Sequence, residues 1–336
     1  MITILLISFL ILVLLGIPIA FALGISSIFA LVYVGDYSLM VVVQRMFTAV
    51  DSFSLMAIPF FMFSGGLMES GGISKRIVNF ANALVGFITG GLAMVGVVSS
   101  MIFAGISGSA VATTAAMGSI LIPSMEEKKY DKGFSAAVLA AAGTTGPIIP
   151  PSIPLVVYGS IAGVSIGSLF VGGYIPGFMI GFALMAVSYY ISKKRNYPKA
   201  ERFTIKEILT STREAILAII MPLIIIGGIL FGIFTPTEAG AVASVYAFIV
   251  GAFIYKELKL EDIPKILKDG VINTVIVLFL IAVASLFSWI ITAERVPQMI
   301  AAFFLGISNN KYVILFLINI LLLIVGMFID VVPALT

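Results

Sequence analysis

The sequence predicts an all-α, polytopic membrane protein with broken helices, re-entrant helical hairpins and two repeated halves of inverted topology. Of its 336 residues, 61% are hydrophobic and only 10% are charged, whereas a soluble domain carries about a quarter charged residues. The mean hydropathy is +1.20. Long apolar runs recur with short polar interruptions, and a bilayer accepts such helices where water does not.

The apolar runs define the expected helices. They span residues 2–34, 53–68, 77–105, 109–123, 133–146, 153–172, 174–192, 213–234, 237–255, 271–292, 296–307 and 312–329. A spanning helix needs about 20 residues, so we expect the first run to be tilted, or broken near residues 16–18 (Gly-Ile-Pro). Because residues 1–15 lack a positively charged start, we interpret them as a membrane helix, with a cleaved signal peptide as the alternative.

Two shorter segments are more polar, and each precedes a strongly apolar run. They cover residues 38–50 and 260–270. Segments of this kind lie along the membrane surface as amphipathic helices. We therefore predict two interfacial helices.

The charged residues indicate orientation. One short loop concentrates basic side chains against the single acid Glu201: Lys193, Lys194, Arg195, Lys199 and Arg202. Cytoplasmic loops carry such an excess of Lys and Arg, so residues 193–206 are predicted to be cytoplasmic. The net charge of +3 is attributed to basic loops of this kind rather than to a nucleic-acid partner.

The absence of cysteine and histidine excludes several functions. No disulfide, thiol nucleophile or imidazole-ligated metal is possible. Residues 105–108 (GISG) fit the pattern of an intramembrane serine protease, but that chemistry requires a general base, in that family a histidine. No phosphate-binding loop of the ATP-driven pumps is present either.

The two halves of the chain resemble each other. Pro18 opens an apolar run, as Pro236 does 218 positions later, and Gly105 aligns with Gly326 at an offset of 221. Similar offsets from separate anchors suggest a duplication, and inverted repeats are typical of secondary transporters. The predicted parts are a first repeat, a cytoplasmic linker and a second repeat, at residues 1–192, 193–212 and 213–336.

The first expected break in a membrane helix is at residues 105–109 (GISGS). It separates apolar pieces at 91–106 and 110–122, which are short for a spanning helix. Two half-helices meeting at a Gly/Ser tip predict a re-entrant hairpin over about 91–123. Its backbone needs protein or a cavity around it at that depth. The alternative is close helix packing through small residues.

The second break covers residues 143–154 (GTTGPIIPPSIP), with four prolines in eight residues. Proline lacks an N–H and crowds the preceding turn, so a helix cannot continue through this stretch. Its freed carbonyls and its Ser and Thr hydroxyls are hard oxygen ligands suited to an alkali cation. We predict an unwound, ion-binding stretch between half-helices.

The third break covers residues 326–333 and contains Asp330. An acid inside an apolar run usually marks an ion or substrate path; the alternative is a helix cap at the surface. Arg295, beside Glu294, is the other charged candidate. It either binds a substrate carboxylate bidentately or anchors the chain at the interface through Glu294.

Three segments together resemble a known family: residues 105–110 (GISGSA), 143–154 and 231–239 (FGIFTPTEA). The chain is similar, over essentially its whole length, to the large membrane subunit of tripartite ATP-independent periplasmic (TRAP) transporters. The resemblance implies a bacterial inner-membrane importer that couples Na⁺ to the uptake of a small organic acid. It also implies an elevator mechanism, a small four-helix membrane subunit and a periplasmic binding protein as partners. Sialic acid, slightly favoured, and C4-dicarboxylates are the expected substrates.

The resemblance also implies site residues. A first sodium site would use hydroxyls of the hairpin tip and carbonyls of the unwound stretch, at Ser107, Ser109, Gly146, Ile149 and Pro151. A second sodium site would involve Asp330, and Arg295 and Ser152 would contact the substrate. The family's subunit continues past the position of Thr336, so we expect the second hairpin to be cut at its tip.

Two other functions remain as alternatives. A non-transporting scaffold subunit would tolerate alanine at the polar breaks. An ion channel would need regularly placed pore-lining polar residues and a selectivity filter, and the sequence shows neither pattern.

Overall fold

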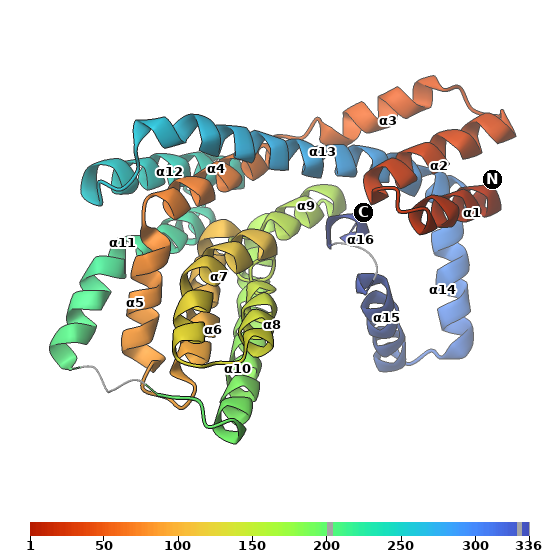
Figure 1. Cartoon of the computed structure of the whole chain (residues 1–336). Helices are drawn as coiled ribbons and strands as arrows, with labels where there is room; N and C mark the ends of the chain where they lie inside the picture. The colour runs from red at the N-terminus through yellow and green to blue at the C-terminus, as the bar shows by residue number, and fades with distance from the viewer. Residues whose placement is uncertain (200–203, 328–330, 336) are drawn as a thin grey trace. The chain divides into compact units, whose positions relative to one another are not determined.

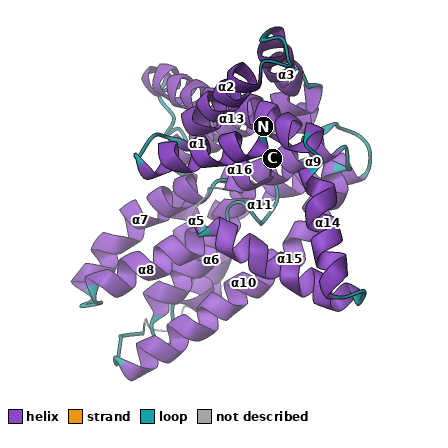
Figure 2. Ribbon diagram, turned by 90° about the vertical axis from the view of Figure 1, so that its right-hand side faces the viewer, coloured by secondary structure: helices purple, strands orange, loops and turns teal. Residues whose placement is uncertain are grey.

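The computed structural model describes residues 1–199, 204–327 and 331–335, and in these ranges it contains helices and turns but no strand (Figure 1, Figure 2). The predicted all-α, polytopic class is confirmed. Within the described ranges, five helices are long and apolar enough to cross a bilayer: Phe53–Ser70, Ile166–Lys194, Lys206–Leu230, Pro236–Ile254 and Leu260–Ala293.

The chain divides into two compact units. One comprises Met1–Ser52 and Val275–Thr336, and the other comprises Phe53–Thr274. The first unit therefore combines the two ends of the chain, while the second holds the predicted hairpin and the unwound stretch. α13 (Ile263–Ala293) contributes residues to both units.

The first unit contains the predicted break in the initial apolar run. It is built from helices α1 to α3, the second part of α13 and helices α14 to α16: Ile2–Leu14, Ile19–Val34, Met40–Val50, Val296–Ile307, Lys311–Gly326 and Val331–Leu335. Between α1 and α2, Gly16 adopts a φ of +78° and Pro18 occupies the N-cap position of α2. Leu5 and Leu31 then bury against Leu286 of α13. The break predicted near residues 16–18 is confirmed.

The two predicted surface helices differ in the structure. α3 is a separate helix with no buried residue, and the Arg45 guanidinium lies 5.3 Å from the Trp289 ring centroid. Residues 260–270 are not a separate helix, because a 3-10 turn at Leu260–Asp262 leads directly into α13. Pro264 lies in the first turn of α13, where proline is tolerated, and Gly270 is accommodated within the helix, so neither residue ends it.

The second unit surrounds one buried helix. It contains α4 to α12 in chain order: Ala57–Ser70, Ile73–Val85, Gly91–Ser107, Ala110–Glu127, Lys132–Gly143, Ile153–Ala162, Ile166–Lys194, Ile205–Leu230 and Pro236–Ile249. α6 contacts α4, α5, α7, α8 and α10. Of its 17 residues, 14 are buried. A helix that is apolar on every side is expected at such a central position.

α12 packs along α4 and along the 3-10 turn before it (Phe53–Met56) through small and hydroxyl-bearing residues. The Thr237 hydroxyl donates to the Phe53 carbonyl at 2.8 Å, and the Ser244 hydroxyl to the Phe60 carbonyl at 3.0 Å. At Gly240, an added β-carbon would lie 2.9 Å from that of Phe60. Small residues let membrane helices approach in this way.

Two predicted helix boundaries are wrong. The apolar run at 77–105 covers most of two helices, α5 and α6, and Gly90 between them has a φ of +74°. The break expected near residue 173 lies instead at Gly163, with a φ of +64°, and α10 continues for 29 residues. Gly173 lies inside α10, where its lack of a side chain allows close packing on the unwound stretch. A β-carbon there would lie 2.5 Å from the Ile148 carbonyl oxygen.

Two further boundaries extend beyond the predicted ones. α7 continues through Pro123 to Glu127, past the end expected at about residue 123. α11 begins at Ile205, inside the predicted linker at 193–212. Its start is fixed by a capping box, in which the side chains of Thr204 and Glu207 each bind the other's backbone N–H.

Helix starts recur between the two halves. α2 and α12 begin at residues 19 and 236, α6 and α15 at 91 and 311, and α7 and α16 at 110 and 331. The offsets of 217, 220 and 221 are close to those of the sequence anchors. This supports the duplication, and its inverted topology stays a prediction.

The FTPTEA segment is the start of α12. Thr235 is the N-cap and Pro236 the first helical residue, while Glu238 completes a capping box with its carboxylate 2.8 Å from the Thr235 nitrogen. Proline at this position costs no hydrogen bond, because that N–H has no helical partner. One of the three family-like segments is therefore a helix-start signal.

Replacing Thr235 by alanine removes this cap, and we expect it to lower the free energy of unfolding by about 1 kcal/mol. The measurement is thermal unfolding of the purified protein in detergent. Thr210→Ala is the matched control, since Thr210 is exposed within α11 and caps nothing. Equal melting temperatures for the two variants would contradict the capping role.

Candidate functional site

The predicted hairpin break lies where α6 meets α7. α6 ends at Ser107, and Gly108 follows with a φ of +60°, a left-handed conformation that glycine adopts without strain. Ser109 is extended and caps α7, because its hydroxyl accepts a hydrogen bond from the Ala112 nitrogen at 3.4 Å. The C-terminus of one helix and the N-terminus of the next therefore meet at this Gly/Ser tip.

The unwound stretch is also present. α8 ends at Gly143 and α9 begins at Ile153, so residues 144–152 form no helix. The peptide bond between Pro150 and Pro151 is cis. Ser152 caps α9 by accepting from the Leu155 nitrogen at 3.3 Å, and its hydroxyl donates to the Pro147 carbonyl. The predicted break at 143–154 is confirmed.

The hairpin tip packs directly on the unwound stretch through backbone atoms. A β-carbon at Gly108 would lie 2.8 Å from the Pro151 carbonyl oxygen, and one at Gly105 would lie 3.3 Å from that of Pro150. In the unwound stretch, a β-carbon at Gly146 would lie 2.5 Å from the Ser109 carbonyl oxygen of the hairpin tip. Glycine at these positions allows the two backbones to touch.

Several neutral oxygen atoms gather at this contact. The Ser107 hydroxyl lies 2.8 Å from that of Thr113 and 3.4 Å from the Ser109 carbonyl oxygen. The Thr113 hydroxyl donates to the same carbonyl at 2.8 Å. Ser107 is 5% exposed and Thr113 is fully buried. Buried, uncharged hydroxyl and carbonyl oxygens are hard ligands suited to an alkali cation.

Among the described residues, the side chains show no comparable site for a transition metal. In the described ranges, no group of three or more His, Cys, Asp and Glu side chains is close enough to hold a metal ion.

Thr113 was missed by the sequence analysis. It follows Ser109 by four residues, so it lies one helical turn from the cap and faces the tip. A hydroxyl residue at that spacing after a helix break is the signal that would have found it.

α10 also packs against the unwound stretch. A β-carbon at Gly177 would lie 2.5 Å from the Ile149 side chain, which is buried. Gly173 is equally close to the Ile148 carbonyl. The stretch is therefore enclosed between the hairpin tip and α10.

The predicted site residues fall into three groups. The tip and the stretch bring together Ser107, Ser109, Gly146, Ile149, Pro151 and Ser152. Arg295 lies in the other compact unit, exposed at the N-cap position of α14. Asp330 lies outside the described residues, so the second sodium site has no structural account.

The roles assigned to the charged and capping residues stay predictions. The Glu294 carboxylate lies 3.7 Å from the Met1 amino group, and this leaves both interpretations of Arg295 open. The Ser152 hydroxyl is buried and engaged with Pro147 and Leu155.

Comparison with known proteins matches residues 6–336 to the family described as "Tripartite ATP-independent periplasmic transporter, DctM component". The sialic acid TRAP transporter large permease protein SiaM of Vibrio cholerae is 44% identical over 318 residues, which are 94% of this chain and 74% of that protein. The isethionate TRAP transporter permease protein DctMQ of Oleidesulfovibrio alaskensis is 44% identical over 320 residues, 95% of this chain and 50% of that one.

A third relative carries another substrate name. The C4-dicarboxylate TRAP transporter large permease protein DctM of Pseudomonas aeruginosa is 40% identical over 309 residues, 92% of this chain and 72% of that protein. These matches cover nearly the whole chain, and they agree with the family that its three sequence segments resemble. The chain belongs to the DctM family of TRAP transporter large permease subunits.

Proposed function

We propose that this chain is the permease subunit of a Na⁺-coupled importer of a small organic acid. The observation that supports the proposal most directly is the contact between the hairpin tip and the unwound stretch. There, the buried hydroxyls of Ser107 and Thr113 lie beside the Ser109 carbonyl. Family membership supports transport, and the neutral oxygen atoms support an alkali cation as the coupling ion.

The first sodium ion would be held by the tip and the stretch. Its ligands are the side-chain or backbone oxygens of Ser107, Ser109, Gly146, Ile149 and Pro151. Asp330 would contribute to a second sodium site. Arg295 and Ser152 are the proposed substrate contacts, with the arginine binding the carboxylate as a planar, two-donor partner.

The substrate class is an organic anion. The names of the three relatives refer to sialic acid, isethionate and C4-dicarboxylates, and each of these carries a carboxylate or sulfonate. Two relatives with different substrates are equally similar to this chain, so identity alone does not select one. Sialic acid is the first substrate to test.

The proposed assembly is tripartite and lies in the bacterial inner membrane. It includes a small four-helix membrane subunit and a periplasmic binding protein that delivers the substrate. The loop at residues 193–206 faces the cytoplasm, in keeping with its lysines. Nucleic acid has no part in this function.

Transport would follow an elevator mechanism. The backbones of the hairpin and the unwound stretch are in close contact at three glycines, Gly105, Gly108 and Gly146. Packed interiors resist continuous deformation, so these elements are expected to move together as one body. A binding site carried by such a body can face either side of the membrane in turn.

The test is uptake of radiolabelled sialic acid by the transporter reconstituted in liposomes with its small subunit. We expect uptake only with an inward sodium gradient and with the cognate binding protein. The controls replace sodium by potassium and omit the binding protein.

Other outcomes point to the alternative functions. Uptake with neither requirement would contradict the proposal and indicate a simple carrier or channel. No uptake of sialic acid, C4-dicarboxylates or isethionate would favour a non-transporting scaffold subunit.

A further inference from the structure

Two loops of the second unit are joined by stacked aromatic side chains. The turn between α7 and α8 contributes Tyr130, and the segment after α10 contributes Tyr197. Their ring centroids are 4.3 Å apart, and Tyr197 also packs 5.4 Å from Phe134. Tyr130 and Tyr197 are only 4% and 9% exposed. The stack is therefore a small core at the outer ends of these helices.

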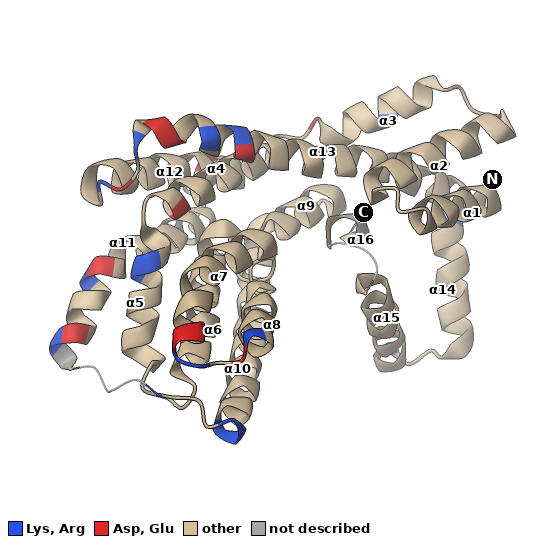
Figure 3. Ribbon diagram, in the orientation of Figure 1, with Lys and Arg blue, Asp and Glu red and all other residues tan. Residues whose placement is uncertain are grey.

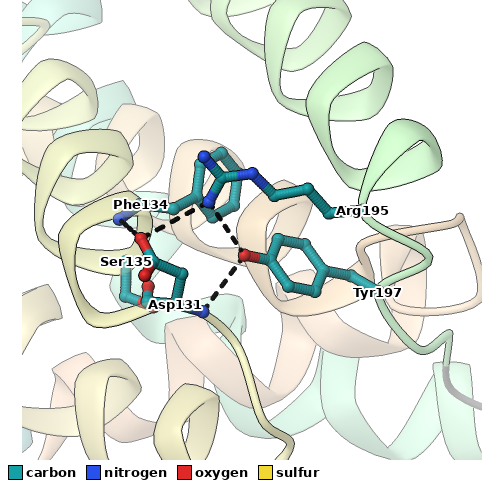
Figure 4. A network of polar contacts seen from close by, with 5 residues as sticks. All are labelled: Asp131, Phe134, Ser135, Arg195 and Tyr197. Atoms are coloured by element: carbon teal, nitrogen blue, oxygen red, sulfur yellow. Dashed lines mark hydrogen bonds and ion pairs between the residues drawn. The ribbon is translucent and has the colours of Figure 1, made fainter.

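Hydrogen bonds fix the same junction (Figure 4). The Tyr197 hydroxyl accepts from the Asp131 backbone nitrogen at 3.1 Å and from the Arg195 guanidinium at 3.3 Å. Arg195 also lies 3.4 Å from the Asp131 carboxylate. The Tyr130 hydroxyl donates to the Pro198 carbonyl at 3.1 Å. Burial raises the pKa of Tyr130 to about 12, so this donor keeps its proton at neutral pH.

The junction joins two segments that each carry exposed lysines. We call these lysines the basic surface; the six, all exposed, are Lys128, Lys129, Lys132, Lys193, Lys194 and Lys199. Figure 3 shows basic residues at the end of α10 and at the start of α8. Among the described residues, Lys132 is the one lysine of this set with a carboxylate within 4 Å, that of Glu126.

The basic surface lies at the end of a candidate membrane span, and this position indicates which kind of partner it can meet. α10 is long and apolar enough to span a bilayer, and Lys193 and Lys194 occupy its last turn. Lysines at that depth reach the headgroup layer by extending their side chains. The cytoplasmic leaflet is negatively charged, and it attracts lysines close to it.

We propose that the basic surface binds the headgroups of anionic phospholipids. Tyr130 and Tyr197 hold the two lysine groups together, so that one headgroup meets cations from both loops. The inference depends on the cytoplasmic orientation of residues 193–206 in the proposed function. A soluble acidic protein would meet the same charges, but it would not require them at the end of a spanning helix.

The test uses the purified transporter, assembled with its small subunit, and measures binding of phosphatidylglycerol and phosphatidylcholine by native mass spectrometry. We expect phosphatidylglycerol to bind more tightly. Replacing Lys128, Lys129, Lys193 and Lys194 by glutamine should weaken phosphatidylglycerol binding at least about tenfold, because each lysine near a membrane surface contributes up to about fivefold. Phosphatidylcholine binding should not change.

A matched variant controls for total charge. It replaces four exposed lysines elsewhere in the second unit by glutamine: Lys256, Lys259, Lys265 and Lys268. This variant should keep its affinity for phosphatidylglycerol within about twofold, because none of these lysines belongs to the basic surface. Similar losses in both variants would show a general charge effect and overturn the assignment.

A second pair of variants tests the junction itself. Tyr197→Ala keeps every charge but removes the stack, and it should weaken phosphatidylglycerol binding about threefold as the loops separate. Tyr197→Phe keeps the ring and should bind as the wild type does. Wild-type binding by Tyr197→Ala would overturn the role of the junction.

The orientation is checked separately, since the chain contains no cysteine. A Lys199→Cys variant in spheroplasts should react with a membrane-impermeant maleimide only after the membrane is permeabilised. Labelling of intact spheroplasts would overturn the proposal. None of these measurements depends on transport, so their failure is distinguishable from failure of the proposed function.

Discussion

Replacing Gly146 by alanine is expected to lower sodium-driven uptake about 100-fold, since displacing a binding group by about 1 Å has an effect of that size. The added β-carbon would lie 2.5 Å from the Ser109 carbonyl oxygen, 2.7 Å from its carbon and 3.0 Å from the Ala110 nitrogen. All three are backbone atoms, which cannot rotate away. The unwound stretch must therefore move off the hairpin tip, and the oxygen atoms proposed to hold sodium separate.

The measurement is initial uptake at several sodium concentrations, with melting temperature and small-subunit assembly recorded for each variant. Gly172→Ala is the matched control, because a β-carbon there meets no atom within 4 Å. Gly118→Ala tests the hairpin itself, since its β-carbon would make an ordinary contact of 3.6 Å with Ile122. Both should transport normally. Wild-type sodium dependence in Gly146→Ala would show that the contact is not part of the ion site.

The breaks that could be predicted from sequence are those with local chemical causes. Proline removes a backbone donor and crowds the preceding turn, so the stretch at 143–154 was identifiable without knowledge of its neighbours. Gly108 and Gly16 supply left-handed turns, and each stands beside residues that favour helix starts. The FTPTEA segment is equally local, because a capping box is complete within four residues.

The wrong boundaries have non-local causes. The predicted runs at 153–172 and 174–192 place a boundary at residue 173, yet Gly173 lies within a helix and is approached closely by the Ile148 carbonyl. A glycine that permits close packing and a glycine that ends a helix look the same in sequence. The division at Gly90 could not be predicted for a related reason, because this glycine lies within a mostly apolar run.

The candidate site was only partly predictable for the same reason. Ser107 and Ser109 were predicted because their segment resembles a family motif, which also forms a helix break, whereas Thr113 lies within a regular helix and its contact with Ser107 depends on the fold. The contact between Gly146 and the Ser109 carbonyl joins residues 37 positions apart. The grouping of both chain ends in one compact unit likewise depends on packing that no local pattern encodes.

Ser107→Ala should raise the sodium concentration needed for half-maximal uptake about tenfold, in line with the loss of one oxygen contact to a charged group. The Ser107 hydroxyl lies 2.8 Å from the Thr113 hydroxyl and 3.4 Å from the Ser109 carbonyl. Its loss removes a proposed ligand and leaves the Thr113 contact to Ser109 in place. The concentration of substrate for half-maximal uptake, measured at saturating sodium, should change less than about twofold. Asp330→Asn is expected to act in the same direction at the second sodium site.

Ser100→Ala is the control that separates ligand loss from a change in packing. Ser100 lies on the same helix, is fully buried, and its hydroxyl has no hydrogen-bond partner among the described residues. Removing that hydroxyl should leave the sodium dependence of uptake unchanged. If Ser107→Ala matches the wild type in its sodium titration, or if its defect falls on substrate affinity instead, the hairpin tip is not the sodium site. The small Ser and Gly residues there would then serve helix packing. Close approaches at the tip also fit that alternative, since a β-carbon added at Gly65 would lie 3.5 Å from the Ser107 α-carbon.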